Sequence, residues 1–387
     1  MLKKDLLQEK LTVVSKMKVL IAAGGTGGHV NPALAVAGEI RKRHPEAEIC
    51  FVGTPDRIEA KIVPEAGFPL KTIEISGFKR SFSPDAIKAN MKTVTRLLKS
   101  SGAVKKIIND FKPDVVVGFG GYVSGPVVRM AAKMGVPTAI HEQNAYPGIT
   151  NKALAEKVDV VMLTAEEAKK HMNIKNKMVV TGLPVRGELL EADPQKSREE
   201  LGFDSKPLIL SMGGSLGARA INEAITDVVS KIWKDNTCNF LIATGQYGLW
   251  VPDLMKEKGV DLDNAKNIEI REYINDMARC LSACDLVICR AGASSLSEFQ
   301  ALGKASILIP SPNVTENHQY HNAMALVNNN AAVIIEEKDL TGDRLLEEIN
   351  KLISDKTKLN EIGANAKKMA TLNAKEQITD IVLALIK

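Results

Sequence analysis

Short runs of apolar, often β-branched residues alternate along the chain with segments whose apolar residues recur at helical spacing. Seven runs in the first half are predicted strands: Lys18–Ala23, Glu48–Val52, Lys71–Ile75, Asp114–Gly118, Pro137–Ile140, Val158–Leu163 and Met178–Val180. After a polar stretch, the pattern restarts with six more: Pro207–Ser211, Asn239–Ala243, Asn267–Ile270, Asp285–Cys289, Ala305–Ile309 and Ala332–Ile335. This alternation is typical of parallel βαβ units.

The restart of the pattern predicts two doubly wound α/β domains, at 17–185 and 186–370, joined near Gly182–Glu188. Helices are expected after the last strand, at Leu340–Ser354, Lys356–Ala370 and Ala374–Ile386. The last of these can cross back, so that 371–387 packs on the first domain. Residues 1–16 are expected to be an N-terminal extension with leucines at near-helical spacing. It is either an extension from an upstream start or a surface helix, with an amphipathic helix that touches a membrane as the alternative.

Composition excludes several classes of protein. The chain has 387 residues, 45% of them hydrophobic, a formal net charge of +5 and only 4% aromatic residues, which argues against a nucleic-acid partner. No apolar run approaches the roughly 20 residues of a membrane-spanning helix. The five cysteines form no CxxC pair, which predicts no zinc site and a reducing cytoplasmic location.

Two glycine-rich turns, Gly24–His29 and Gly213–Arg219, each follow a predicted strand and precede a predicted helix. We expect the first helix to begin near Asn31–Pro32, since proline suits a first helical turn. Glycines let backbone N–H groups approach an anion, and a helix N-terminus favours negative charge. The first turn fits neither the dinucleotide fingerprint nor the P-loop, because the third glycine is missing and no Lys-Ser/Thr follows. Tight packing without a ligand is the alternative for either turn alone, and His29 can be a neutral base or a local cap.

Several motifs together closely resemble the MurG family of bacterial glycosyltransferases. The resemblance covers residues 17–387 and is carried by Ala22–Ala33, His141–Asn144, Gly182–Arg186, Gly213–Ala218 and Ser297–Glu298. It implies the GT-B fold, in which two Rossmann-like domains face each other across a cleft. It also implies an inverting transfer of N-acetylglucosamine from UDP-N-acetylglucosamine to the C4 hydroxyl of the muramyl sugar of lipid I. The product is lipid II, a precursor of peptidoglycan.

The resemblance assigns candidate binding residues in both domains. Ser215 is similar to a diphosphate contact, Ile274 to a backbone contact with uracil, and Glu298 to a ribose ligand. Further donor-site positions are Arg186, Gln319, Ser297 and the helix start formed by Ala293, Ser294, Ser295 and Leu296. The family's donor-sugar and acceptor pyrophosphate positions in the first domain correspond to Thr26, Gly27, Gly28 and Asn144. Some members have two glutamines where this chain has His318–Gln319, which leaves the role of His318 open.

An inverting transfer needs a base for the attacking hydroxyl and charge stabilisation for the departing UDP. His29 is the candidate base, and Glu142 can share that task. The amides of Gly213–Ala218 would stabilise the diphosphate, so we expect no metal and no cofactor. Asp261–Asp263 resembles a cation-binding triplet but lies in a polar connection away from either turn, and is read as a solvated loop.

The segment Lys71–Lys112 carries ten basic and three acidic residues, with Phe78, Phe82 and Met91 among them. It is either a solvated helix face or a surface that docks on anionic lipid at the cytoplasmic face of the membrane. Two other functions stay open on this fold. One is a UDP-N-acetylglucosamine 2-epimerase, and the other is a non-catalytic protein that binds a nucleotide sugar or a lipid.

Overall fold

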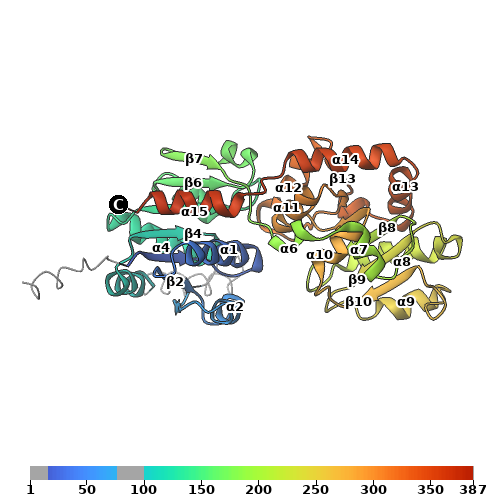
Figure 1. Cartoon of the computed structure of the whole chain (residues 1–387), viewed down its shortest axis with the longest axis horizontal. Coiled ribbons are helices and arrows are strands. Elements are labelled where there is room, and N and C mark those ends of the chain that lie inside the picture. The colour runs from blue at the N-terminus through green and yellow to red at the C-terminus, as the bar shows by residue number, and fades with distance from the viewer. Residues whose placement is uncertain (1–15, 76–99, 387) are drawn as a thin grey trace, which may run out of the picture. The chain divides into compact units, whose positions relative to one another are not determined.

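The protein, described here from a computed structural model, contains two parallel β-sheets within the described residues 16–75 and 100–386 (Figure 1). In the described ranges the first sheet has seven strands in the order β3-β2-β1-β4-β5-β6-β7. Their bounds are β1 Lys18–Ala22, β2 Glu48–Gly53, β3 Leu70–Thr72, β4 Val115–Gly118, β5 Thr138–Glu142, β6 Val160–Leu163 and β7 Lys177–Val180. The order reverses between β1 and β4, which makes that position the topological switch point.

The second sheet has six strands in the order β10-β9-β8-β11-β12-β13 within the described part of the chain. Their bounds are β8 Leu208–Met212, β9 Asn239–Ala243, β10 Ile268–Arg271, β11 Leu286–Cys289, β12 Ala305–Leu308 and β13 Val333–Ile334. Here the order reverses between β8 and β11. Each predicted strand is therefore confirmed, with ends that differ by at most a few residues.

Helices separate the strands, as the alternating pattern predicts. Those that accompany the first sheet are α1 Gly27–Arg43, α2 Glu59–Glu65, α4 Gly121–Lys133 and α5 Ile149–Leu154. Those that accompany the second are α6 Gly187–Glu191, α7 Pro194–Glu200, α8 Arg219–Ile232, α9 Val251–Glu257, α10 Met277–Ala283, α11 Ala293–Leu302, α12 His318–Val327, α13 Gly342–Ile353 and α14 Lys356–Lys368. The last helix, α15, spans Ala374–Ala384. Short 3₁₀ turns lie at Glu166–His171, Trp233–Asp235, Thr315–Asn317 and Glu337–Asp339.

Side chains on the two faces of the second sheet enter two separate cores. Ile209 and Ile288 pack with residues of α8 and α13, whereas Leu208, Leu210 and Val287 pack with residues of α10, α11 and α12. Alternation along β8 sends successive side chains to opposite faces. Because both faces are covered, the strand reads as a nearly continuous apolar run.

The chain divides into two compact units. The first takes in the described residues of Met1–Ile140, Lys157–Val160 and Thr379–Lys387, and the second takes in His141–Glu156 and Val161–Ile378. Within the first unit, Arg43 of α1 pairs with Asp380 of α15 at 2.5 Å. This grouping places Thr379–Lys387 in the first unit, and the packing of 371–387 on the first domain stays a prediction.

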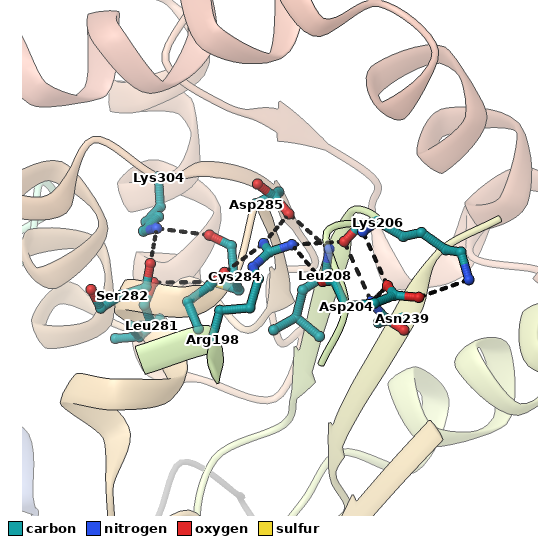
Figure 2. A network of polar contacts seen from close by, with 11 residues as sticks. Arg198, Asp204, Lys206, Leu208, Asn239, Leu281, Ser282, Cys284, Asp285 and Lys304 are labelled. Carbon is teal, nitrogen blue, oxygen red and sulfur yellow. Dashed lines mark hydrogen bonds and ion pairs between the residues drawn. The ribbon is translucent and has the colours of Figure 1, made fainter. Parts of the chain in front are cut away.

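Polar contacts hold the amino-terminal edge of the second sheet together (Figure 2). Asp285, just before β11, accepts hydrogen bonds from Arg198 Nη2 at 2.5 Å and from Leu208 N at 2.8 Å. Lys304, just before β12, donates to the carbonyl of Cys284 at 2.7 Å. This edge is opposite to the ends of the strands from which the glycine turns emerge. Ligands of open α/β sheets bind at the carboxyl edge, so this network contributes to the stability of the sheet.

Candidate active site

Both glycine turns emerge at the switch point of a sheet. The first follows β1, whose neighbour across the reversal is β4, and the second follows β8, whose neighbour is β11. In open α/β sheets, ligands bind outside the carboxyl ends of the strands at this point. Each turn also leads directly into a long helix, α1 or α8. The fold thus places each glycine turn at the position where open α/β sheets bind ligands.

The first helix begins at Gly27, so the expected start near Asn31–Pro32 is wrong. Thr26 has extended backbone angles and its carbonyl accepts from the amides of His29 at 3.1 Å and Val30 at 3.2 Å. Pro32 consequently lies inside the helix. The amides of Gly27 and Gly28 are in the first turn, where a helix offers them no intrahelical acceptor. The predicted binding positions Thr26, Gly27 and Gly28 are thereby brought together at a helix N-terminus.

His29 lies in this first turn, and its ring is anchored to the glycine turn. Nδ1 lies 3.0 Å from the carbonyl oxygen of Gly24 and 3.3 Å from Thr26 Oγ1. A carbonyl oxygen can only accept, so a neutral ring that makes this bond carries its proton on Nδ1. Nε2 then holds the lone pair, which is the state that a general base requires.

The second glycine turn forms backbone hydrogen bonds with the loop that follows β9. Ser215 and Leu216 carbonyls accept from the amides of Gln246 at 3.1 Å and Tyr247 at 3.0 Å. Gly217 has a φ of +84°, and a Cβ at that position would lie 2.1 Å from the carbonyl oxygen of Thr244. Only glycine fits this approach without moving backbone. The turn that carries the predicted diphosphate contact Ser215 is therefore held against this loop by backbone hydrogen bonds and close packing.

A second helix N-terminus lies at the same switch point. Helix α11 starts at Ala293, directly after β11, so the predicted helix start over Ala293, Ser294, Ser295 and Leu296 is found. The amides of its first turn are oriented like those of other helix N-termini, toward solvent or ligand. Ser297 and Leu296 are buried against the core. The second unit thus offers two amide-rich elements, Gly213–Ala218 and α11, at one edge.

Glu298 and Arg186, predicted separately as donor ligands, form an ion pair. Arg186 Nη2 and Nε lie 2.8 and 2.9 Å from Glu298 Oε1. Burial raises the pKa of Glu298, and the Arg186 guanidinium acts against that shift. Both contacts use Oε1.

Gln319 and Ile274 are each held by the second unit. Gln319 Oε1 accepts from the amide of Ser311 at 2.9 Å, which fixes the direction of its amide group. The Ile274 side chain is buried in the core, which is compatible with a role for its backbone only. His318 Nδ1 lies 2.8 Å from the carbonyl of Thr315, so this ring closes the preceding 3₁₀ turn.

Glu142, considered above as a partner base, is engaged in a turn. Its buried carboxylate accepts from Asn144 N at 2.9 Å, Gly148 N at 3.1 Å and Asn151 Nδ2 at 2.8 Å. Asn144 in turn accepts at Oδ1 from Asn322 Nδ2 at 3.1 Å. Through these bonds Glu142 stabilises the conformation of the loop that contains Asn144. Sequence reasoning missed Asn322.

His141 is a buried histidine whose protonation opposes folding. Nε2 donates to the carbonyl of Gly182 at 2.9 Å, and burial lowers the pKa of His141 to about 4. The unfolded chain, with a histidine pKa of about 6.5, binds this proton first, so stability is lost as pH falls from about 6.5 to 4. We expect about 3 kcal/mol less stability at pH 4 than at pH 7 from this group.

Urea unfolding across that pH range measures the effect against a His141→Gln variant. The variant should lack this part of the slope. An equal slope in both chains would show that His141 is not the group responsible.

Other predicted features lie outside these sites. Most of the basic segment, including Phe78, Phe82 and Met91, falls outside the described residues, as does the extension before residue 16. Asp261 accepts from Asn264 Nδ2 at 2.7 Å in a local turn. All five cysteines are buried, and none of the described helices is long and apolar enough to cross a membrane.

Comparison with known proteins gives consistent matches over most of the chain. The models of the glycosyltransferase family 28 N-terminal and C-terminal domains match residues 19–163 and 208–378. A protein of Acetivibrio thermocellus is 45% identical over 96% of this chain and 99% of its own. A protein of Listeria welshimeri is 44% identical over 96% and 100%. Both are named UDP-N-acetylglucosamine–N-acetylmuramyl-(pentapeptide) pyrophosphoryl-undecaprenol N-acetylglucosamine transferase.

Solved structures match equally far along the chain. The crystal structure of Acinetobacter baumannii MurG has a TM-score of 0.77 at 29% identity and covers 95% of this chain and 99% of its own. A UDP-GlcNAc 2-epimerase from Neisseria meningitidis, bound to UDP-GlcNAc, has a TM-score of 0.64 at 16% identity, with coverage of 95% and 100%. The second likeness is one of fold alone.

Proposed function

We propose that this chain, which belongs to glycosyltransferase family 28, transfers N-acetylglucosamine from UDP-N-acetylglucosamine to lipid I to form lipid II. The pair of glycine turns, one at the switch point of each sheet, is the main support for this proposal. Of the two, the first alone contains a histidine, and its ring is anchored at Nδ1. The two turns can thus serve two different substrates.

The second unit is suited to the nucleotide donor. The amides of Gly213–Ala218 and of the start of α11 converge on one edge, where they can bind a diphosphate. Glu298, oriented by Arg186, is suited to accept from ribose hydroxyls, and Gln319 both donates and accepts. As UDP departs, negative charge grows on the diphosphate, and the amides stabilise it. The proposed reaction uses no metal, and EDTA is expected to leave turnover unchanged.

The first unit is suited to the acceptor. Amides of Gly27 and Gly28 at the start of α1 can bind the acceptor pyrophosphate. His29 Nε2 would take the proton of the attacking hydroxyl while that oxygen forms its bond to the donor's anomeric carbon. The glycosidic bond to UDP breaks in the same step, and configuration inverts. Asn144, which belongs to the second unit, is a further candidate binding position by resemblance to the family.

An epimerase is the second candidate, because proteins of that name share the fold. An epimerase acts on the donor alone and needs no acceptor. Purified full-length chain should therefore be incubated with UDP-N-acetylglucosamine in the presence and absence of a lipid I analogue. We expect lipid II and stoichiometric UDP only with the acceptor. Formation of UDP-N-acetylmannosamine without acceptor would refute the proposed transfer and support the epimerase.

The lipid-linked acceptor implies contact with a membrane surface. We propose peripheral binding at the inner face, through the basic segment that includes Lys79, Arg80 and Lys88, which lie outside the described residues. Each basic residue near anionic lipid contributes about 1 kcal/mol. Neutralising these three residues is expected to reduce co-sedimentation with anionic liposomes at low salt. Undiminished binding would rule out this segment as the docking surface.

A further inference from the structure

Glu59 is a fully buried carboxylate that lies against the first glycine turn. It is the first residue of α2, with an exposed fraction of 0%. Oε1 accepts from Thr54 N at 3.0 Å and Thr54 Oγ1 at 2.8 Å, while Oε2 accepts from Gly25 N at 2.9 Å. No lysine or arginine forms an ion pair with it within the described part of the chain. A buried charge of this kind is costly, which calls for a reason beyond packing.

The bond to Gly25 reaches His29 through a single peptide group. The N–H of Gly25 and the C=O of Gly24 belong to the same peptide. Its N–H donates to Glu59, and its oxygen accepts from His29 Nδ1 at 3.0 Å. The carboxylate polarises this peptide, so its oxygen becomes a stronger acceptor, since linked hydrogen bonds strengthen one another.

The chain leaves room for this arrangement by using glycine where other residues would collide. A Cβ on Gly24 would lie 2.5 Å from Glu59 Oε1, and one on Gly53 would lie 2.6 Å from Glu59 Cγ. A Cβ on Gly121 would lie 2.3 Å from the carbonyl oxygen of Gly24. Glycines in three separate segments thus leave the space in which the Glu59 carboxylate, the Gly24–Gly25 peptide and the His29 ring form successive hydrogen bonds.

We propose that Glu59 is a positioning residue for His29, acting through the Gly24–Gly25 peptide. It holds the carbonyl that keeps the Nδ1 proton in place, and it stabilises the positive charge that His29 gains when Nε2 takes the acceptor's proton. This inference rests on the proposed function for its catalytic consequence. The hydrogen-bond relay, which runs from Glu59 through the Gly24–Gly25 peptide to His29, does not depend on the proposed function.

A purely structural role for Glu59 makes different predictions. Capping the loop before α2 would affect stability alone, and the state of His29 would not change. Glu59→Gln separates the two, because glutamine keeps the volume but has one acceptor oxygen and no charge. In either orientation of its amide, the charge that polarises the Gly24–Gly25 peptide is lost, together with the bond to Gly25 N–H or to Thr54 N–H.

Histidine ¹⁵N spectra of the full chain test the relay without an activity assay. The chain has six histidines, so a His29→Asn spectrum identifies the signal of His29. We expect the neutral ring of the parent chain to carry its proton on Nδ1, and Glu59→Gln to shift it toward Nε2. A parent ring protonated on Nε2 would overturn the proposal, as would a tautomer that is unchanged in Glu59→Gln.

Kinetics provide the second readout. Glu59→Gln is expected to lower kcat about 10- to 100-fold, with the KM for UDP-N-acetylglucosamine changed less than about threefold. Thr54→Val, which removes one bond to Oε1 and keeps the Gly25 contact, should retain the parent kcat to within about twofold. A similar loss in both variants would contradict the positioning role. Absence of transfer by the parent chain would instead count against the proposed function.

Discussion

Replacing His29 with alanine is expected to lower kcat about 10²- to 10⁴-fold, the usual contribution of a general base. The KM for UDP-N-acetylglucosamine should change little, because the groups suited to bind the donor belong to the second unit. The ring is placed for this role by its Nδ1 contact with the carbonyl of Gly24 at 3.0 Å. Steady-state kinetics with both substrates varied measures the split between kcat and KM.

His29→Asn is the matched control, since its amide can still donate to the Gly24 carbonyl but has no lone pair of suitable basicity. If the ring acts as base, both variants are equally slow. Recovery of turnover by asparagine would show that His29 serves only to anchor the turn.

Gly217→Ala is expected to remove donor binding and to destabilise the second unit by about 3 kcal/mol or more. The new Cβ would lie 2.1 Å from Thr244 O and 3.2 Å from Thr244 C, and both atoms are backbone. The positive φ of +84° adds strain for alanine. Either the turn or the loop after β9 must move, and the amides around Ser215 move with it. Titration with UDP and urea unfolding measure the two losses.

Gly214→Ala provides the comparison for backbone strain alone. Gly214 has a φ of +89°, yet a Cβ there meets nothing within 4 Å. We expect this variant to lose about 1 to 2 kcal/mol of stability and to keep measurable UDP binding. Equal losses in the two variants would show that the contact with Thr244 does not define the turn.

The fold could be predicted from the sequence because its signals are local. Buried parallel strands are continuous apolar runs, and the helices between them keep a separate period, so each strand could be located. The start of α1 could not be predicted from these local signals. Pro32 suggested a first turn, but Thr26 provides the carbonyl that begins the helix, and Gly27 and Gly28 adopt helical angles. Glycine and proline mark turns as readily as they tolerate a helix.

The parts of the site that the sequence did not reveal depend on strand order. Glu59 reaches Gly25 because β2 lies beside β1, and Gly121 reaches Gly24 because β4 lies on the other side. Neither residue stands in a recognisable motif. Arg186 and Glu298 were both expected near the donor, but their pairing at 2.8 Å joins segments 112 residues apart. Such pairings follow from tertiary structure, and spacing alone does not contain them.

The two glycine turns are proposed to bind different substrates, and a crystal structure with UDP-N-acetylglucosamine bound would show which turn holds the donor. We expect the diphosphate within hydrogen-bond distance of the amides of Gly213–Ala218 or of the start of α11, and a ribose hydroxyl on Glu298. A donor diphosphate bound instead at Gly24–His29 would contradict the assignment and leave His29 without its proposed role as base.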